Sequence, residues 1–404
     1  MKNPQLRRDI QPVPFMAEGR RMVSFNDPLR LARAGVALDG RAIPLLMLLD
    51  GTRDLRGIQV QLARLNHGAI IPMAELEAFV AALDESGLLE SESFLARKQA
   101  VRDEFERLSE RGHCLAGRSY PAEPEAITAG IRQAEERLGP VDGEIASGRV
   151  RGILAPHIDI SVAHDTYVGA YRCLAGREYD LVIILGINHN GSGGLWSISD
   201  KDYATPVGTL KAHRELIAGL KERIPEGALA PDDFDHKHEH SVEFQAVFLR
   251  HYLGEGARIV PILCGGIHEF VSSGQSPLAD RRFLAMRQAL HEIMERGGRT
   301  LLVAGVDFSH VGLKFGHDQP ADLLLPGARA GDERILQSLR EGSPEGIFAQ
   351  ATATRDFCNV CGLPAMLLFS WLLGPCPSKL LGHGTYDEQT TRSAVTYASM
   401  VFFE

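Results

Sequence analysis

The stretch LVIILGINH, residues 181–189, decides the fold class. It opens on an unbroken apolar run, as strands do when a parallel sheet is buried on both faces. Similar runs recur from residue 149 onward, separated by segments with helical spacing: VRGILAP at 150–156, RIVPILCGG at 258–266 and TLLVAGVDF at 300–308. This alternation predicts an α/β fold with a mostly parallel central sheet covered by helices.

The end of the chain and two linking segments carry further expectations. The run SAVTYASMVFF at 393–403 predicts an antiparallel strand at the edge of the sheet. Residues 266–279 and 313–328 are rich in Gly, Pro and Asp and are expected to be loops.

The 404 residues divide, by pattern, into a small N-terminal domain at 1–95, a charged linker helix at 96–111 and an α/β domain at 112–404. Three apolar-periodic segments in the first domain end near Gly51, Gly68 and Gly87, as helices with glycine C-caps do. Residues 29–40 are expected to supply a short strand pair. The pattern resembles a winged helix, and more closely the PqqD-like domains that hold peptide substrates. A helical packing or dimerisation module fits it equally well.

Composition excludes several classes of protein. The net charge of −9 makes a nucleic-acid binder unlikely, because such proteins usually present a basic face. No apolar run is long enough for a membrane span, and residues 1–15 lack the apolar core of a secretion signal. We therefore expect a cytoplasmic protein. Its six cysteines are predicted to be free, buried or metal-bound rather than paired in disulfides.

Side chains that bind transition metals or move protons stand just after predicted strands or at helix starts. They are His157, His189, His240, Asp307, His310 and Cys361. Because the carboxyl ends of parallel strands open on one crevice, these residues are expected to meet although 200 positions separate some of them.

Six segments in order resemble the Memo family, also known as protein B of the AmmeMemoRadiSam system. They are APHID, LGINHN, DHKHEHSVEFQ, PILCGG, VDFSH and NVCGLPA, preceded by LAGRSYP at 115–121. The family pattern runs approximately AGSWYP, APHAGY, GPSHH, DEHSIE, PILVG, SSDFSH and ICG. The resemblance covers about residues 112–404 and implies a fold similar to class III extradiol dioxygenases.

The resemblance also implies a metal site. Carried over motif by motif, the ligands are His157, His189 and Cys361, while His240, Asp307 and His310 line the same pocket. The chain departs from the pattern at three places. Asp159 adds a carboxylate after the first ligand, within Ile158–Ile160 where the family has AGY. Asn190 replaces the second histidine of the pair, and Ser119 replaces the tryptophan of AGSWYP.

Two imidazoles and one thiolate leave positions open on a metal, as reactive sites do. The soft thiolate favours Fe(II), with copper or zinc as alternatives. Cys361 precedes a predicted helix, whose positive end is expected to lower its pKa. Glu239 and Glu243 are expected to fix the tautomer of His240, which then serves as a proton donor, and Asp159, Asp307 and His310 are candidate catalytic groups.

Three functions compete. The first is a metal-dependent redox or oxygen-using enzyme in a radical-SAM-associated pathway, acting on a peptide or an aromatic metabolite as its small-molecule ligand. The second is a non-catalytic metal- or peptide-binding adaptor whose N-terminal domain recruits a partner. The third, which the acidic charge disfavours, is a winged-helix regulator sensing metal or redox state.

Two further patterns, one of cysteines and one of histidines, have non-catalytic interpretations. Cys358 and Cys361 form a C-x-x-C pair, but no second pair completes a zinc ribbon, so Cys358 is expected to be an ordinary buried thiol. His236 and His238 alternate with His240 and are compatible with an adventitious surface metal site.

Overall fold

The computed structural model of this chain describes residues 2–191 and 193–404, in two compact units, residues 1–107 and 108–404. In the described residues, no helix is both long and apolar enough to cross a bilayer. The boundary between the two compact units falls at Arg107, within the stretch 96–111 that was predicted to link two domains.

The N-terminal unit combines a small antiparallel sheet with helices and has its own core. Its elements are β1 Gln11–Ala17, β2 Arg20–Asn26, β3 Ala37–Asp39, the 3-10 turn η1 Gly40–Ala42, α1 Ile43–Leu48, α2 Leu55–Leu65, α3 Met73–Glu85 and α4 Glu92–Glu106. The strand order is β1-β2-β3. Ile58, Leu62, Leu76 and Leu83 recur at helical spacing and pack together in the core. Gly87, at φ 72°, ends α3 in the conformation expected of a cap.

The predicted strand pair at 29–40 is wrong except for β3. β3 pairs with β2, and β2 pairs with β1, which the sequence did not reveal. Prolines at 12 and 14 remove two amide donors from β1, and such residues normally argue against a strand. β1 is an edge strand, where proline is tolerated.

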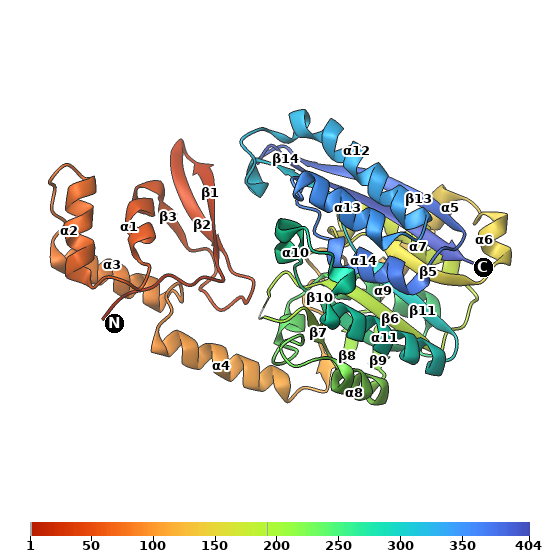
Figure 1. Cartoon of the computed structure of the whole chain (residues 1–404). Helices are drawn as coiled ribbons and strands as arrows, with labels where there is room; N and C mark the ends of the chain where they lie inside the picture. The colour runs from red at the N-terminus through yellow and green to blue at the C-terminus, as the bar shows by residue number, and fades with distance from the viewer. Residues whose placement is uncertain (1, 192) are drawn as a thin grey trace. The chain divides into compact units, whose positions relative to one another are not determined.

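The second unit alternates strands and helices as predicted, and Figure 1 labels most of them. Its strands are β4 Glu110–Arg111, β5 Val150–Ala155, β6 Leu181–Ile187, β7 Trp196–Ile198, β8 Asp202–Thr205, β9 Gly208–Ala212, β10 Arg258–Cys264, β11 Thr300–Gly305, β12 His310–Gly312, β13 Ser378–Glu388 and β14 Ser393–Phe403. Its α-helices are α5 Pro124–Leu138, α6 Gly143–Ser147, α7 Ile160–Tyr171, α8 Arg214–Arg223, α9 Ser241–Leu253, α10 His268–Ser273, α11 Arg281–Arg296, α12 Ala321–Arg340, α13 Pro344–Thr354 and α14 Leu363–Leu373. Its 3-10 turns are η2 Arg172–Leu174, η3 Phe234–Lys237, η4 Pro277–Ala279 and η5 Leu313–Phe315.

The sheet order is β12-β14-β5-β11-β6-β10-β9-β8-β4, with β13 on β14 and β7 on β10. β5, β11, β6 and β10 run parallel to their neighbours in this series, which confirms the mostly parallel α/β fold. β14 is antiparallel as predicted, but it is not at the edge. β13 pairs along one edge of β14, while β5 and β12 pair with different parts of its other edge. This central place agrees with the burial of most β14 residues.

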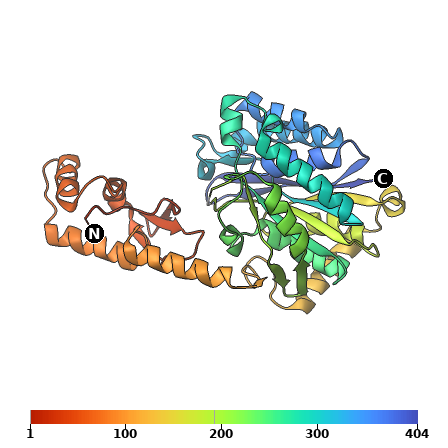
Figure 2. The ribbon, with the colours of Figure 1, turned by 60° about the horizontal axis from the view of Figure 1, so that its bottom comes forward.

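Helices cover both faces of the sheet (Figures 1 and 2). α8, α11, α12, α13 and α14 contribute to the core on one face, and α5, α6, α7 and α9 to the core on the other. Successive strand residues divide between the two cores: Ile183 and Leu185 face the first, Val182 and Ile184 the second. Two covered faces explain why the central strands read as unbroken apolar runs.

The expected loop at 313–328 is wrong over its second half, which forms the start of α12. Pro326 lies inside this helix, where proline normally breaks the backbone hydrogen-bond ladder. Ala321 and Ala328 pack with Val311 and Ala394 in a small core, and this packing outweighs the local composition. Within 266–279, α10 and η4 likewise occupy part of the expected loop.

Candidate metal centre

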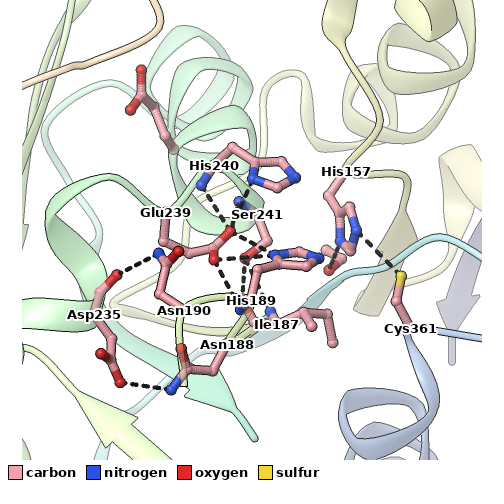
Figure 3. Close-up of polar contacts among 12 residues, drawn as sticks. His157, Ile187, Asn188, His189, Asn190, Asp235, Glu239, His240, Ser241 and Cys361 are labelled. Carbon is pink, nitrogen blue, oxygen red and sulfur yellow. Dashed lines mark hydrogen bonds and ion pairs between the residues drawn. The ribbon is translucent and has the colours of Figure 1, made fainter. Parts of the chain in front are cut away.

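The structure brings His157, His189 and Cys361 together from three separate elements. His157 follows β5, His189 follows β6, and Cys361 stands two residues before α14. β5 and β6 both run parallel to β11, which lies between them, so their carboxyl ends open on the same edge of the sheet. Figure 3 shows the two imidazoles and the sulfur converging on one point.

His157 is held in one orientation by backbone contacts. Its Nδ1 lies 3.0 Å from the carbonyl of Gly305 at the end of β11, so Nδ1 carries the proton and donates. Its own backbone N–H donates to Asp307 Oδ1 at 3.0 Å. The side chain is buried, and its Nε2 is left facing Cys361 Sγ at 3.4 Å.

His189 is oriented by a buried carboxylate. Its Nδ1 lies 3.1 Å from both oxygens of Glu239, and its backbone N–H donates to Glu239 Oε2 at 3.2 Å. The same carboxylate accepts from the backbone N–H groups of His240 and Ser241 at 2.8 and 2.9 Å. A carboxylate or carbonyl on the second ring nitrogen is the usual support of a metal-binding imidazole, and both histidines have it.

The donor set fits a transition metal. The ligand atoms of His157, His189 and Cys361 all lie within 4.8 Å of one another. Two bonds of the usual zinc–nitrogen and zinc–sulfur lengths at a tetrahedral angle place nitrogen and sulfur about 3.6 Å apart. The 3.4 Å between His157 Nε2 and Cys361 Sγ is close to that value. The residues present therefore suit the metal that the family resemblance implies.

His240 lies beside the two histidines at the N-terminus of α9. Its ring stacks on His189 at 4.7 Å between centroids and meets His157 edge-on at 5.2 Å. Its Nδ1 lies 3.1 Å from Glu239 Oε1. Enclosure alone would lower the pKa of His240, but the Glu239 carboxylate outweighs it and raises that pKa. A direct contact thus supports the predicted role of Glu239 in orienting the His240 ring, whereas the Glu243 side chain points away from this ring.

Asp307 and His310 flank the same centre. Asp307 Oδ2 lies 3.6 Å from His157 Nε2, and burial raises the pKa of this carboxyl to about 7. His310 Nδ1 donates to the carbonyl of Phe308 at 3.0 Å. Burial, with the charge of His189 acting in the same direction, lowers the pKa of His310 to about 4.

The thiol of Cys361 differs from expectation. Burial, together with the nearby Asp307 carboxylate, raises the pKa of Cys361 well above its usual range. The helix end was expected to lower it, but desolvation of the thiolate is the larger effect. A bound cation reverses this balance, because it compensates the charge of a coordinating sulfur.

Other predicted residues lie outside the cluster. Asp159 caps α7, where its Oδ1 accepts from the backbone N–H and the hydroxyl of Ser161. Asn190 donates to the backbone carbonyl of Asp235 at 3.5 Å. The surface metal site is wrong for His236, which is buried: its Nε2 donates to Ser197 O and its Nδ1 accepts from the Tyr203 hydroxyl.

A buried ion pair behind the centre was missed. Arg111 pairs with Glu243, and its guanidinium also donates to the carbonyls of His236 and Glu239 at 2.9 and 2.7 Å. Glu243 accepts in addition from the Tyr120 hydroxyl at 2.6 Å. The pair fixes the backbone that carries Glu239. In the sequence, the available signal for this ion pair was Glu243, a charged residue in the mostly apolar first half of α9.

Comparison with known proteins identifies the group to which the chain is related. The sequence pattern of the family described as Memo-like protein matches residues 111–401. The chain belongs to the Memo family. A MEMO1 family protein of Aquifex aeolicus is 30% identical over 381 residues, which cover 94% of this chain and 95% of that protein.

The Memo relatives differ in how much of the chain they share. A MEMO1 family protein of Thermus thermophilus is 29% identical over 86% of this chain and 99% of its own length. One of Methanosarcina barkeri is 27% identical over 72% of this chain and 99% of its own length. The Aquifex alignment covers 94% of this chain, so it must include most of unit 1–107. The Methanosarcina coverage is close to the share of the chain that residues 108–404 make up. The Memo fold is therefore the second unit.

Proposed function

We propose that this Memo family protein is a metal-dependent oxidoreductase whose metal is held by His157, His189 and Cys361. One observation carries the proposal. Two imidazoles, each with its Nδ1 engaged by a backbone carbonyl or a carboxylate, meet one sulfur so that the three ligand atoms lie within 4.8 Å of one another. Such preorientation from elements far apart in sequence is typical of metal ligands rather than of structural histidines.

The metal would supply a redox-active or Lewis-acidic centre with open positions for a substrate. Iron fits a set of two nitrogens and one soft sulfur, and copper or zinc are the alternatives. The chain's own groups would position the substrate and handle protons. His240, oriented through Nδ1 by Glu239, would present Nε2 to a substrate, and Asp307, with a pKa of about 7, would exchange a proton near neutral pH.

The substrate class and partner rest on the family resemblance. We propose an aromatic metabolite or a peptide as the substrate, within a pathway that includes a radical-SAM protein. The separate N-terminal unit supports this, since an appended domain can present a peptide. Its PqqD-like or winged-helix character stays a prediction.

A non-catalytic adaptor is the second candidate. Cys361 would supply a thiolate in place of the carboxylate that oxygenases with two histidine ligands use, and its half-buried sulfur lies 3.4 Å from His157 Nε2. A site of this kind can hold a metal tightly without catalysing a reaction.

Metal analysis tests the ligand assignment. Purified wild-type protein is expected to carry about one transition metal per chain, and H157A, H189A and C361A to carry none while keeping the wild-type circular dichroism spectrum. The matched control is C264A, because Cys264 is buried in the core on β10 and should leave metal content unchanged. Retention of the metal by all three ligand variants would overturn the proposal.

Oxygen uptake separates enzyme from adaptor. Anaerobically Fe(II)-loaded protein is mixed with oxygen and a panel of catechols and phenols. Uptake that needs both His157 and an aromatic substrate supports the oxidoreductase. Full metal loading with no uptake for any substrate supports the adaptor.

A further inference from the structure

The backbone carbonyls on either side of His157 are both held by buried side chains. β5 ends two residues before His157, so these carbonyls lie beyond the strand. Gln245 Nε2 donates to Pro156 O at 2.9 Å. The Tyr167 hydroxyl donates to Ile158 O at 2.7 Å. Because an enclosed carbonyl needs a partner once the strand has ended, these two side chains determine the course of the backbone through His157.

The amide of Gln245 is completely buried and has a partner at each of its polar groups. Its Nε2 donates a second hydrogen bond, to Ser241 O at 3.0 Å, and its Oε1 accepts from the Tyr171 hydroxyl at 2.7 Å. Burial raises the pKa of Tyr171 well above its usual range, so the hydroxyl keeps its proton and remains a donor. With both donor positions and the acceptor engaged, only one orientation of the amide satisfies the network.

The second donor contact connects Gln245 to the other histidine ligand. Ser241 lies one helical turn before Gln245 on α9, so both face the same side of that helix. Ser241 Oγ accepts from the backbone N–H of Ile187 at 2.9 Å, and Ile187 is the last residue of β6, two positions before His189. Gln245 therefore joins the loop after β5 to the helix turn that holds the end of β6.

The amide also packs against the group that orients the His157 ring. Gly305, at the end of β11, accepts the proton of His157 Nδ1 at 3.0 Å. A Cβ at Gly305 would lie 2.6 Å from Gln245 Nε2, so glycine leaves the space that the amide occupies. Gln245 thus contacts the backbone that precedes the ring and also the backbone that receives its hydrogen bond.

We propose that Gln245 is a positioning residue of the metal centre, which fixes the imidazole of His157 relative to that of His189. The Tyr171 hydroxyl keeps the Gln245 amide from turning over, and Tyr167 holds the far side of the His157 loop. This role rests on the proposed metal centre. It extends the support of the centre from the groups that touch the ligands to a buried network on α7 and α9.

The tautomer of His157 in the metal-free protein tests this role without any metal. Nitrogen NMR of the full chain, isotopically labelled in histidine, distinguishes a ring with its proton on Nδ1 from a ring that exchanges between both tautomers. The His157 signals are identified by their loss in H157A. The wild type is expected to hold the proton on Nδ1, and Q245M to show an average of the two tautomers.

Metal affinity is the second readout, with Co(II) as the probe. Competition with a chelator measures the affinity, and the visible spectrum of bound Co(II) reports the coordination geometry. Q245M keeps the length of the side chain but leaves Pro156 O without its donor. It is expected to bind Co(II) about tenfold more weakly, with an altered spectrum. Y171F releases only the orientation of the amide and should lose a smaller part of the affinity.

The matched control is Y179F. The Tyr179 hydroxyl donates to Val150 O at 2.8 Å, at the opposite end of β5 from His157. Y179F therefore removes a buried hydroxyl from the same strand, as a merely structural loss would. It should leave both the His157 tautomer and the Co(II) affinity as in the wild type, whereas Y171F changes them.

A folded Q245M protein with the wild-type tautomer and the wild-type Co(II) affinity would overturn the role. Equal changes in Y171F and Y179F would also overturn it, and this pair decides the matter if Q245M fails to fold. Absence of metal binding in the wild type would instead contradict the metal proposal. A His157 tautomer that still depends on Gln245 would, even then, support the positioning role.

Discussion

At the scale of single residues, the candidate centre depends on side chains that touch the ligands without being ligands. Glu239 accepts hydrogen bonds from His189, His240 and Ser241, and it is buried. Burial would raise the pKa of Glu239, but the two histidines outweigh it and hold that pKa well below its usual range. The carboxylate therefore stays ionised and determines where both rings point.

Replacing Glu239 by glutamine should weaken metal binding about 10- to 100-fold, the usual cost of losing a partner that orients a ligand. Competition with a chelator measures the affinity. The exposed Glu226 offers the matched control E226Q, which should bind metal as the wild type does. An E239Q protein with unaltered affinity would show that His189 needs no such support.

The buried pair of Arg111 and Glu243 leads to a pH prediction. Burial would raise the pKa of Glu243, but Arg111 lowers it to about 2, below the ordinary 4.5. A lowered folded-state pKa stabilises the fold above pH 4.5, and this stabilisation is lost as pH falls toward 2. The shift corresponds to about 3 kcal/mol at neutral pH.

E243Q should accordingly unfold more easily by about 3–5 kcal/mol at pH 7, since it leaves Arg111 buried without its partner. The difference from the wild type should shrink as the pH is lowered from 4.5 toward 2. Urea unfolding followed by tryptophan fluorescence reports on the second unit, because Trp196 and Trp371 both lie in it. A difference that stays constant across this pH range would refute the assignment.

At the scale of elements, the start of α14 sets the position of Cys361. Gly362 lies so close to its surroundings that a Cβ would meet Asp307 O at 2.6 Å, Met366 Cε at 2.7 Å and Val306 Cβ at 2.8 Å. G362A should therefore push α14 away from β11, lower the free energy of unfolding by about 1–3 kcal/mol and reduce metal affinity.

The control for G362A is G327A. A Cβ at Gly327 has open space around it, and alanine there should stabilise α12 by up to about 1 kcal/mol. Thermal unfolding and metal titration of the two variants make the comparison. Equal behaviour of the two alanine variants would contradict the close packing at Cys361.

The elements also show what the sequence can and cannot predict. Strands buried on both faces, such as β6 and β11, are readable because every residue must be apolar. β1 was not predicted because its two prolines argue against a strand. The central place of β14 was not predicted because local periodicity does not determine the order of strands in a sheet. The meeting of His157 and His189 was predictable from the rule that parallel strand ends converge, whereas Cys361, which precedes α14, was placed with them by the family resemblance. Arg111 was not predictable, because its carboxylate partner lies 132 residues further along the chain.

At the scale of the whole molecule, the two units have separate cores, and known relatives match them to different extents. The N-terminal core consists of residues between Ile10 and Leu89, and the larger cores belong to residues after 108. The Methanosarcina relative matches the chain over nearly all its own length while covering only 72% of this chain. The second unit should therefore fold by itself.

A protein of residues 108–404 is expected to melt cooperatively and to bind metal with the affinity of the full chain within about twofold. Calorimetry and metal titration check this. Aggregation or a tenfold lower affinity would mean that residues 1–107 complete the second unit.

The central place of β14 has a consequence for truncated forms of the second unit. Residues 393–403 fill the gap between β13 on one edge and β5 with β12 on the other. Without these residues, β5 presents an open hydrogen-bonding edge that other chains can join. A protein cut before residue 393 is therefore expected to aggregate rather than to fold as a slightly shorter version of this unit.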